Sequence, residues 1–118
     1  MLFQRMPGAI RAVFDAEMDV VARTDEVGLA WRSLENAHIL SQPWPWPHTR
    51  THLAMLTLAL RTRDVREAVG QIIRILVAAP GSAAGRPPRG NTGRACIPMM
   101  RPMPVPVALA ALLNEAGA

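Results

Sequence analysis

The three histidines of the chain, His38, His48 and His52, fall within one short stretch of the sequence. His48 and His52 are four residues apart, so on a helix their imidazoles would share one face. His38 precedes them, and an antiparallel helical hairpin would bring it close to the pair. Three imidazoles are a ligand set for zinc, copper or nickel with one position open, and Met55, three residues beyond His52, would favour Cu(I). The three histidines are therefore candidate ligands of a transition-metal site.

The same three residues also have a structural interpretation. His38 falls near the predicted end of a helix, where its ring could bond a free backbone carbonyl. His48 would then be a first-turn polar residue, and His52 a residue of a helix-packing surface. The sequence has no H-E-x-x-H motif, and no acidic residue between 36 and 63 could act as a base or as a fourth ligand. The sequence leaves both interpretations open.

Between the histidines lies the sequence QPWPWP, residues 42–47, in which prolines alternate with tryptophans. Proline fixes its own φ and disfavours helical angles in the residue before it, so Gln42, Trp44 and Trp46 are predicted to be extended. We interpret the segment as a stiff hinge, with one indole packed as a wedge between two hairpins and the other at least partly exposed. Because tryptophans are good anchors for a partner, Trp44 and Trp46 are candidate partner-binding residues.

A basic loop rich in proline and glycine is predicted over residues 81–104. All thirteen basic residues of the chain are arginine, and the net charge is +4. The sequence GNTG, residues 90–93, could offer backbone N–H groups to an anion, but it lacks the Gly-Lys-Ser/Thr ending of a P-loop and is better explained as a tight turn. The loop has no aromatic residue to stack on a base, so nucleic-acid binding is not favoured. Its Arg89 and Arg94 are instead candidate residues for binding a protein partner.

Cys96 is the single cysteine, so no disulfide can form within the chain and a reducing compartment is expected. Cys96 and the nearby methionines could offer soft ligands to Cu(I), or the methionines could be apolar plugs. No acid–base pair or nucleophile–base pair is in view, and we do not expect an enzyme. No apolar run reaches the ~18 residues of a membrane span, and we expect a cytoplasmic protein that binds no membrane.

Apolar residues spaced three and four apart predict an all-α chain. Asp64 is placed to cap the fourth helix and Pro80 to end it. The predicted helices cover residues 8–23, 25–40, 48–61 and 65–80, with a short last helix within 105–118. In the fourth helix the residues expected to face the core are Val65, Ala68, Val69, Ile72, Ile73 and Leu76.

The order of these helices suggests a repeated hairpin. A shift of 38 residues places Ala30 and Leu34 on Ala68 and Ile72, which are spaced like the second helix of a tetratricopeptide unit. We therefore expect one domain, residues 1–118, built of two tetratricopeptide-like hairpins, with an irregular four-helix bundle as the alternative. Its predicted parts are a first hairpin (8–41), the Trp-Pro hinge (42–47), a second hairpin (48–80), the basic Pro/Gly-rich loop (81–104) and a capping helix (105–118).

Three blocks of the sequence also resemble a known family. They are AWRSLENAHILSQPWPWPHTRTHLAML, APGSAAGRPPRGNTGRA and RPMPVP, and together they cover most of the chain from about residue 30 to 106. On these blocks the chain resembles a bacterial family catalogued as domain of unknown function 3703. The resemblance implies no activity and no ligand, so function has to be argued from the residues.

Two functions from different classes are compatible with these residues. The first is a non-catalytic module that binds a protein or peptide partner through a helix face, since stacked hairpins present a concave surface. The alternative is an accessory protein that binds copper, zinc or nickel through His38, His48 and His52. The oligomeric state and the identity of a partner are not encoded in any motif of the sequence.

Overall fold

Five α-helices occur in the computed structural model, which describes residues 5–83 and 88–117, with the backbone alone for residues 77–83. Neither described part contains a strand. The helices are α1 (Gly8–Arg23), α2 (Val27–Ser41), α3 (Pro45–Arg61), α4 (Val65–Ala83) and α5 (Val107–Glu115). The fold is therefore all-α, as the periodicity of the sequence predicts.

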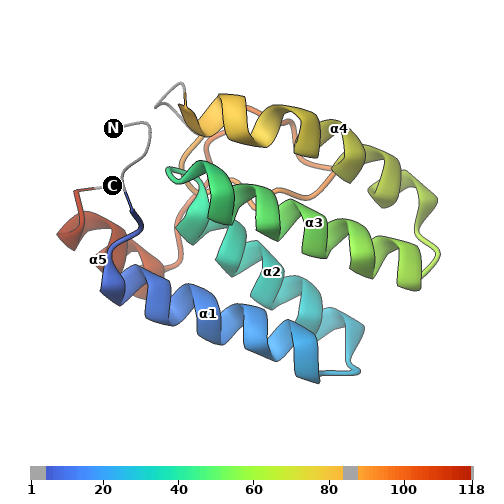
Figure 1. Cartoon of the computed structure of the whole chain (residues 1–118), viewed down its shortest axis with the longest axis horizontal. Helices are drawn as coiled ribbons and strands as arrows, with labels where there is room; N and C mark the ends of the chain where they lie inside the picture. The colour runs from blue at the N-terminus through green and yellow to red at the C-terminus, as the bar shows by residue number, and fades with distance from the viewer. Residues whose placement is uncertain (1–4, 84–87, 118) are drawn as a thin grey trace.

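Two antiparallel hairpins, α1 with α2 and α3 with α4, lie side by side, with α2 next to α3 (Figure 1). The turn of the second hairpin carries the predicted cap, because Oδ1 of Asp64 accepts the backbone N–H of Glu67 at 3.1 Å. Helix α5 packs against α1 and α2, beside the start of α1 (Figure 1). The two predicted hairpins and the short C-terminal helix are confirmed.

Apolar side chains form two clusters. The first is shared by α1, α2, α5 and the segments beside them, and consists of Met6, Ile10, Phe14, Ala37, Ile39, Leu40, Trp44, Leu109 and Leu113. The second joins the two hairpins and consists of Ala30, Trp31, Leu34, Met55, Leu58, Ala59 and Ala68. Because the second cluster takes residues from α2, α3 and α4, it fixes the position of His38 relative to His48 and His52.

The predicted hinge over residues 42–47 is too long. Gln42 keeps helical angles (φ −49°, ψ −41°) and Trp44 is extended, so only a few residues separate α2 from α3, which begins at Pro45. Proline suits the first turn of a helix because its fixed φ is helical and the first N–H groups have no acceptor within the helix. Trp46 therefore lies within α3 and not in an extended segment.

The two indoles of this segment have different surroundings. Trp44 is 7% exposed and packs in the cluster shared by α1, α2 and α5, whereas Trp46 is 68% exposed. The predicted division into one buried and one exposed tryptophan is confirmed. The buried indole packs among residues of the first hairpin and α5, and not as the predicted wedge between the two hairpins.

Helix α4 buries a different face from the one that its periodicity predicts. Of the six residues expected to face the core, only Ala68 is buried. The others are exposed by about half or more of their surface: Val65, Val69, Ile72, Ile73 and Leu76. The buried stripe is polar instead and consists of Glu67, Gln71 and Arg74. The prediction was wrong because periodicity identifies a helix but not the element that covers it.

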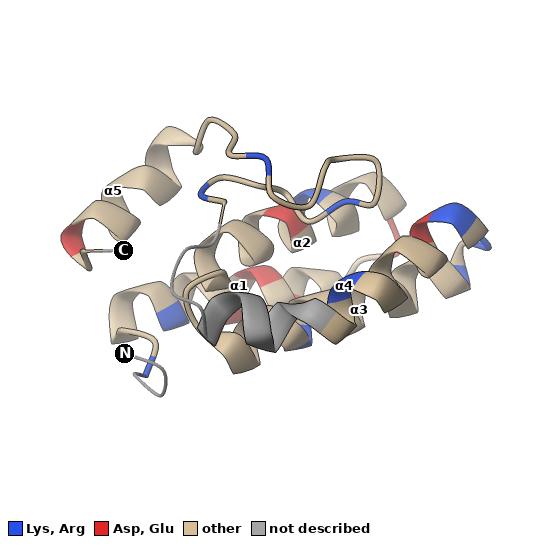
Figure 2. Ribbon diagram, turned by 90° about the horizontal axis from the view of Figure 1, so that it is seen from above, with Lys and Arg blue, Asp and Glu red and all other residues tan. Residues whose placement is uncertain are grey.

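After α4 the chain returns as a loop along one side of the helices before it reaches α5 (Figure 2). Helix α4 runs to Ala83, past Pro80, where the sequence predicts its end. The predicted end at Pro80 is therefore three residues too early, although a proline at this position lacks the N–H of the helical ladder and crowds the carbonyl four residues before it. No helix in the described parts of the chain has the length and hydropathy to cross a membrane.

Candidate metal centre

The side chains of His38, from the last turn of α2, and of His48 and His52, from the first half of α3, meet at one point. Their Nε2 atoms form a nearly equilateral triangle. The edges are 3.0 Å between His38 and His48 and 3.1 Å for each of the other two pairs. All three residues are buried. They are therefore close enough to hold one metal ion.

Hydrogen bonds on the far side of two of these rings decide where their protons lie. Nδ1 of His38 is 2.7 Å from the backbone carbonyl oxygen of Asn91, and Nδ1 of His52 is 2.7 Å from Oε1 of Gln71. A carbonyl oxygen can only accept, so both Nδ1 atoms donate. A neutral imidazole carries one N–H, and Nε2 of each ring therefore holds a lone pair. These two lone pairs face each other across 3.1 Å with no proton between them.

The orientation of the Gln71 amide is fixed by its own partners. Its Nε2 donates to Oε2 of Glu67 at 2.7 Å and to the carbonyl oxygen of Gly93 at 2.9 Å. Neither of these oxygens can donate, so the amide nitrogen must face them and Oε1 must face His52. Such outer partners, which fix the tautomer and the ring orientation, are typical of histidines that bind metal ions.

Burial keeps His38 and His52 neutral at ordinary pH. Burial, together with the charges that His48 and His52 would carry, lowers the pKa of His38 well below its usual value of 6.5. Burial also lowers the pKa of His52 to about 4. At neutral pH these two histidines therefore offer nitrogen lone pairs, and an unprotonated imidazole is the form that binds a metal ion.

We expect the metal-free protein to lose stability as the pH falls from 6.5 towards 5. Unfolded histidine titrates near 6.5, whereas the pKa of folded His52 is about 4. In this range the unfolded chain binds more protons, so acidification favours unfolding. The loss from His52 should be on the order of 2 kcal/mol by pH 5. Urea midpoints at pH 7 and pH 5, with a chelator present, measure this loss of stability. The difference between the two midpoints should be smaller in His52→Gln. Equal midpoints for the wild type at the two pH values would contradict the prediction.

The residues that orient the histidines were not predicted. Gln71 belongs to the buried polar stripe of α4, and Asn91 lies in the sequence GNTG. The Asn91 side chain holds the turn: its Nδ2 donates to the carbonyl oxygens of Pro98 and Arg101, and its Oδ1 accepts the N–H of Gly93. The signal in the sequence was a glutamate and a glutamine four residues apart, on one face of the fourth helix, together with a tight turn containing two glycines.

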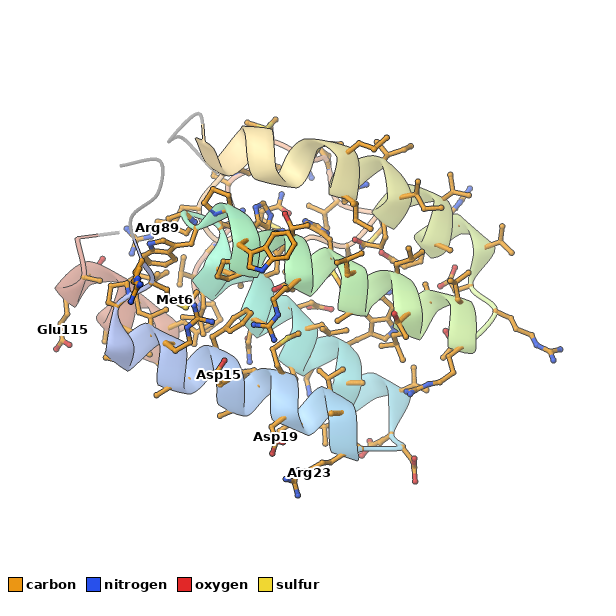
Figure 3. The ribbon with its side chains drawn as sticks, in the orientation of Figure 1. Met6, Asp15, Asp19, Arg23, Arg89 and Glu115 are labelled. Carbon is orange, nitrogen blue, oxygen red and sulfur yellow. The ribbon has the colours of Figure 1, made fainter. Side chains whose placement is uncertain are left out.

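The four candidate partner-binding residues differ in their surroundings. Trp44 is buried and Trp46 is exposed. Arg89 lies near α5, where its Nη2 donates to Oδ1 of Asn114 at 2.6 Å (Figure 3). Arg94 is no solvated charge, because it is paired with glutamates of α2 and α4. Trp46 is therefore accessible as an anchor for a partner. The protein-interaction hypothesis stays a prediction.

Two of the sulfur-containing residues considered as soft ligands, Met55 and Cys96, are not part of the histidine cluster. Met55 packs in the apolar cluster between the hairpins, and Cys96 is exposed on the loop. In the described parts of the chain, the histidine cluster includes neither a cysteine nor a carboxylate. The candidate ligand set is therefore three imidazole nitrogens.

The fold and the site define an all-α protein of two helical hairpins with a buried cluster of three histidines. The chain belongs to a family of proteins of unknown function, DUF3703, whose profile matches residues 8–113. No curated protein and no solved structure matches the chain.

Proposed function

We propose that the protein binds one transition-metal ion through the Nε2 atoms of His38, His48 and His52. The observation that carries the proposal is the pair of lone pairs on His38 and His52, held 3.1 Å apart by hydrogen bonds behind the rings. Hydrogen bonds among the three rings cannot account for this contact, because His48 can donate at most one Nε2 proton to the cluster. A cation at the common point would accept these two lone pairs, together with that of His48 when its proton is on Nδ1.

The size of the triangle supports this assignment. Zinc–nitrogen distances are about 2.0–2.1 Å. A point at that distance from all three nitrogens lies about 1 Å out of the plane of a triangle with edges of 3.0–3.1 Å. An ion at this point would have its three imidazoles on one side and could take a further ligand on the other.

The donor set also restricts the kind of ion. Imidazole nitrogens suit zinc, copper and nickel, whereas calcium, magnesium and manganese prefer oxygen ligands. The nearest carboxylate in the hydrogen-bond network, Glu67, acts through Gln71 and does not face the triangle. We therefore propose zinc, copper or nickel as the bound metal and a metal-binding role without a catalytic one.

Native mass spectrometry of the chain with Zn²⁺, Cu⁺ and Ni²⁺ tests this function. We expect a 1:1 adduct with at least one of the three ions. Thermal unfolding provides a second measurement, since a ligand at 100 times its Kd stabilises the folded state by about 2.7 kcal/mol. A chain that forms no adduct and melts at the same temperature with and without each ion would contradict the proposal.

A further inference from the structure

The loop segment of residues 88–101, here called the strap, lies directly on the histidine cluster. The carbonyl oxygen of its Asn91 accepts the N–H of His38, and the carbonyl oxygen of Gly93 accepts the amide of Gln71. The backbone of Gly93 is so close that a Cβ atom there would come within 2.5–2.8 Å of three atoms of the His38 ring, Nε2 included. The strap therefore lies against the His38 ring, including the nitrogen that would bind the ion.

The strap is held mainly by polar contacts. Neither apolar cluster of the described residues includes a residue of the strap. Beyond its contacts at the site, Arg74 donates to the carbonyl oxygens of Ala95 and Ile97, and Gln42 donates to that of Pro88. Segments with few buried apolar contacts open locally without unfolding of the whole protein.

One strap side chain makes the strongest of these contacts. Nε of Arg94 is 2.9 Å from Oε1 of Glu67 on α4, and its Nη1 is 3.2 Å from Oε2 of Glu35 on α2. The guanidinium also lies over the indole of Trp31, with 3.8 Å from Cζ to the ring centroid. Arg94 thus ties the strap to both helical hairpins at once, in a partly buried position where charge-assisted hydrogen bonds are strong.

The same contacts connect Arg94 to the ligands. Glu67, which pairs with Arg94, also accepts the N–H of Ala95 and the amide of Gln71, and Gln71 in turn accepts the N–H of His52. Loss of the Arg94 contacts would leave the buried carboxylate of Glu67 without its positive partner. Movement of the strap is therefore linked to the hydrogen bonds that hold His52.

We propose that the strap is a lid over the metal site and that Arg94 is the latch that sets how fast the ion enters and leaves. The inference rests on the proposed metal binding. With the lid closed all three histidines are buried, so an ion exchanges with solvent when the strap lifts. Because the lid closes over the metal-free site and the loaded site through the same Arg94 contacts, the latch affects both rates and leaves the affinity nearly unchanged.

The test is the rate of Zn²⁺ transfer from the loaded protein to an excess of chelator, followed by stopped flow. We expect release to be independent of chelator concentration in the wild type and at least about tenfold faster in Arg94→Ala. Uptake should accelerate by a similar factor, so that Kd changes less than about threefold. Glu35→Gln, which removes one of the two carboxylate partners, should give an intermediate acceleration and is the milder variant if Arg94→Ala folds poorly.

Arg101→Ala is the matched control, because Arg101 lies on the same strap, carries the same charge and is exposed. It should release the ion at the wild-type rate. Wild-type rates in both Arg94→Ala and Glu35→Gln would overturn the lid, as would a rise in Kd with unchanged uptake, which would assign Arg94 to ligand positioning. A wild-type chain that binds no ion would instead overturn the proposed function, and the lid with it. Faster amide hydrogen exchange at Ala95 in metal-free Arg94→Ala is expected as well.

Discussion

His52→Ala is expected to weaken binding of the metal ion by at least about 100-fold, because the loss of a residue that only orients a ligand already costs 10–100-fold. The substitution removes one of three nitrogen ligands and also leaves Oε1 of Gln71 without the N–H that it accepts. Competition with a chelating dye, monitored for the ion that native mass spectrometry identifies, measures the loss. Circular dichroism establishes that the helices remain, and His52→Gln provides a variant that keeps a polar group at this buried position.

Met55→Leu is the matched control for this experiment. Met55 lies three residues further along α3, is fully buried in the cluster between the hairpins, and is the residue that would favour Cu(I) if it were a ligand. A change from methionine to leucine nearly conserves volume and costs less than about 1.5 kcal/mol. We expect the metal affinity of this variant to equal that of the wild type. Wild-type affinity in His52→Ala, or a loss in Met55→Leu, would place the ion elsewhere.

Gly93→Ala should destabilise the protein and weaken the metal site together. Gly93 has a φ of +82°, where a side chain costs about 1–2 kcal/mol. The added Cβ would also press on the His38 ring at 2.5–2.8 Å, so either the strap or the imidazole has to move. We expect the free energy of unfolding to fall by about 2–4 kcal/mol and the metal affinity to fall about tenfold or more. Urea denaturation and dye competition measure the two effects.

Gly117→Ala separates the backbone effect from the collision. Gly117 also has a positive φ, +70°, but a Cβ atom there would meet nothing within 4 Å. This variant should lose only the backbone cost of about 1–2 kcal/mol and should bind the ion as the wild type does. Equal urea midpoints for the two alanine variants would show that the Cβ added at residue 93 does not collide with the His38 ring.

Much of the fold follows from local patterns in the sequence. The periodic apolar residues of 8–23 predict the bounds of α1, and Asp64 caps α4 as its residue type suggests. The spacing of His48 and His52 places both on one face of α3, because residues four apart are neighbours on any helix. These predictions succeed because they depend on contacts within a few residues.

The predictions that failed concern which surface a helix presents to the rest of the protein. Helix α4 is covered on its polar stripe by the strap, which begins after the helix has ended and has no periodicity of its own. Because the strap supplies backbone carbonyls and an arginine, Glu67, Gln71 and Arg74 are buried, while apolar residues of α4 remain exposed. Hydrophobic spacing could not reveal an element that binds through hydrogen bonds.

The sequence by itself determined the helices, their order in two hairpins and the three histidines as possible ligands, since each of these depends on spacing along the chain. Only the tertiary structure decided that the three Nε2 atoms converge, because His38 is brought to His48 and His52 by packing between the hairpins. It also decided the tautomers of His38 and His52 through Asn91 and Gln71. Asn91 lies 53 residues from His38 and Gln71 lies 19 from His52, distances over which only the folded chain specifies a contact.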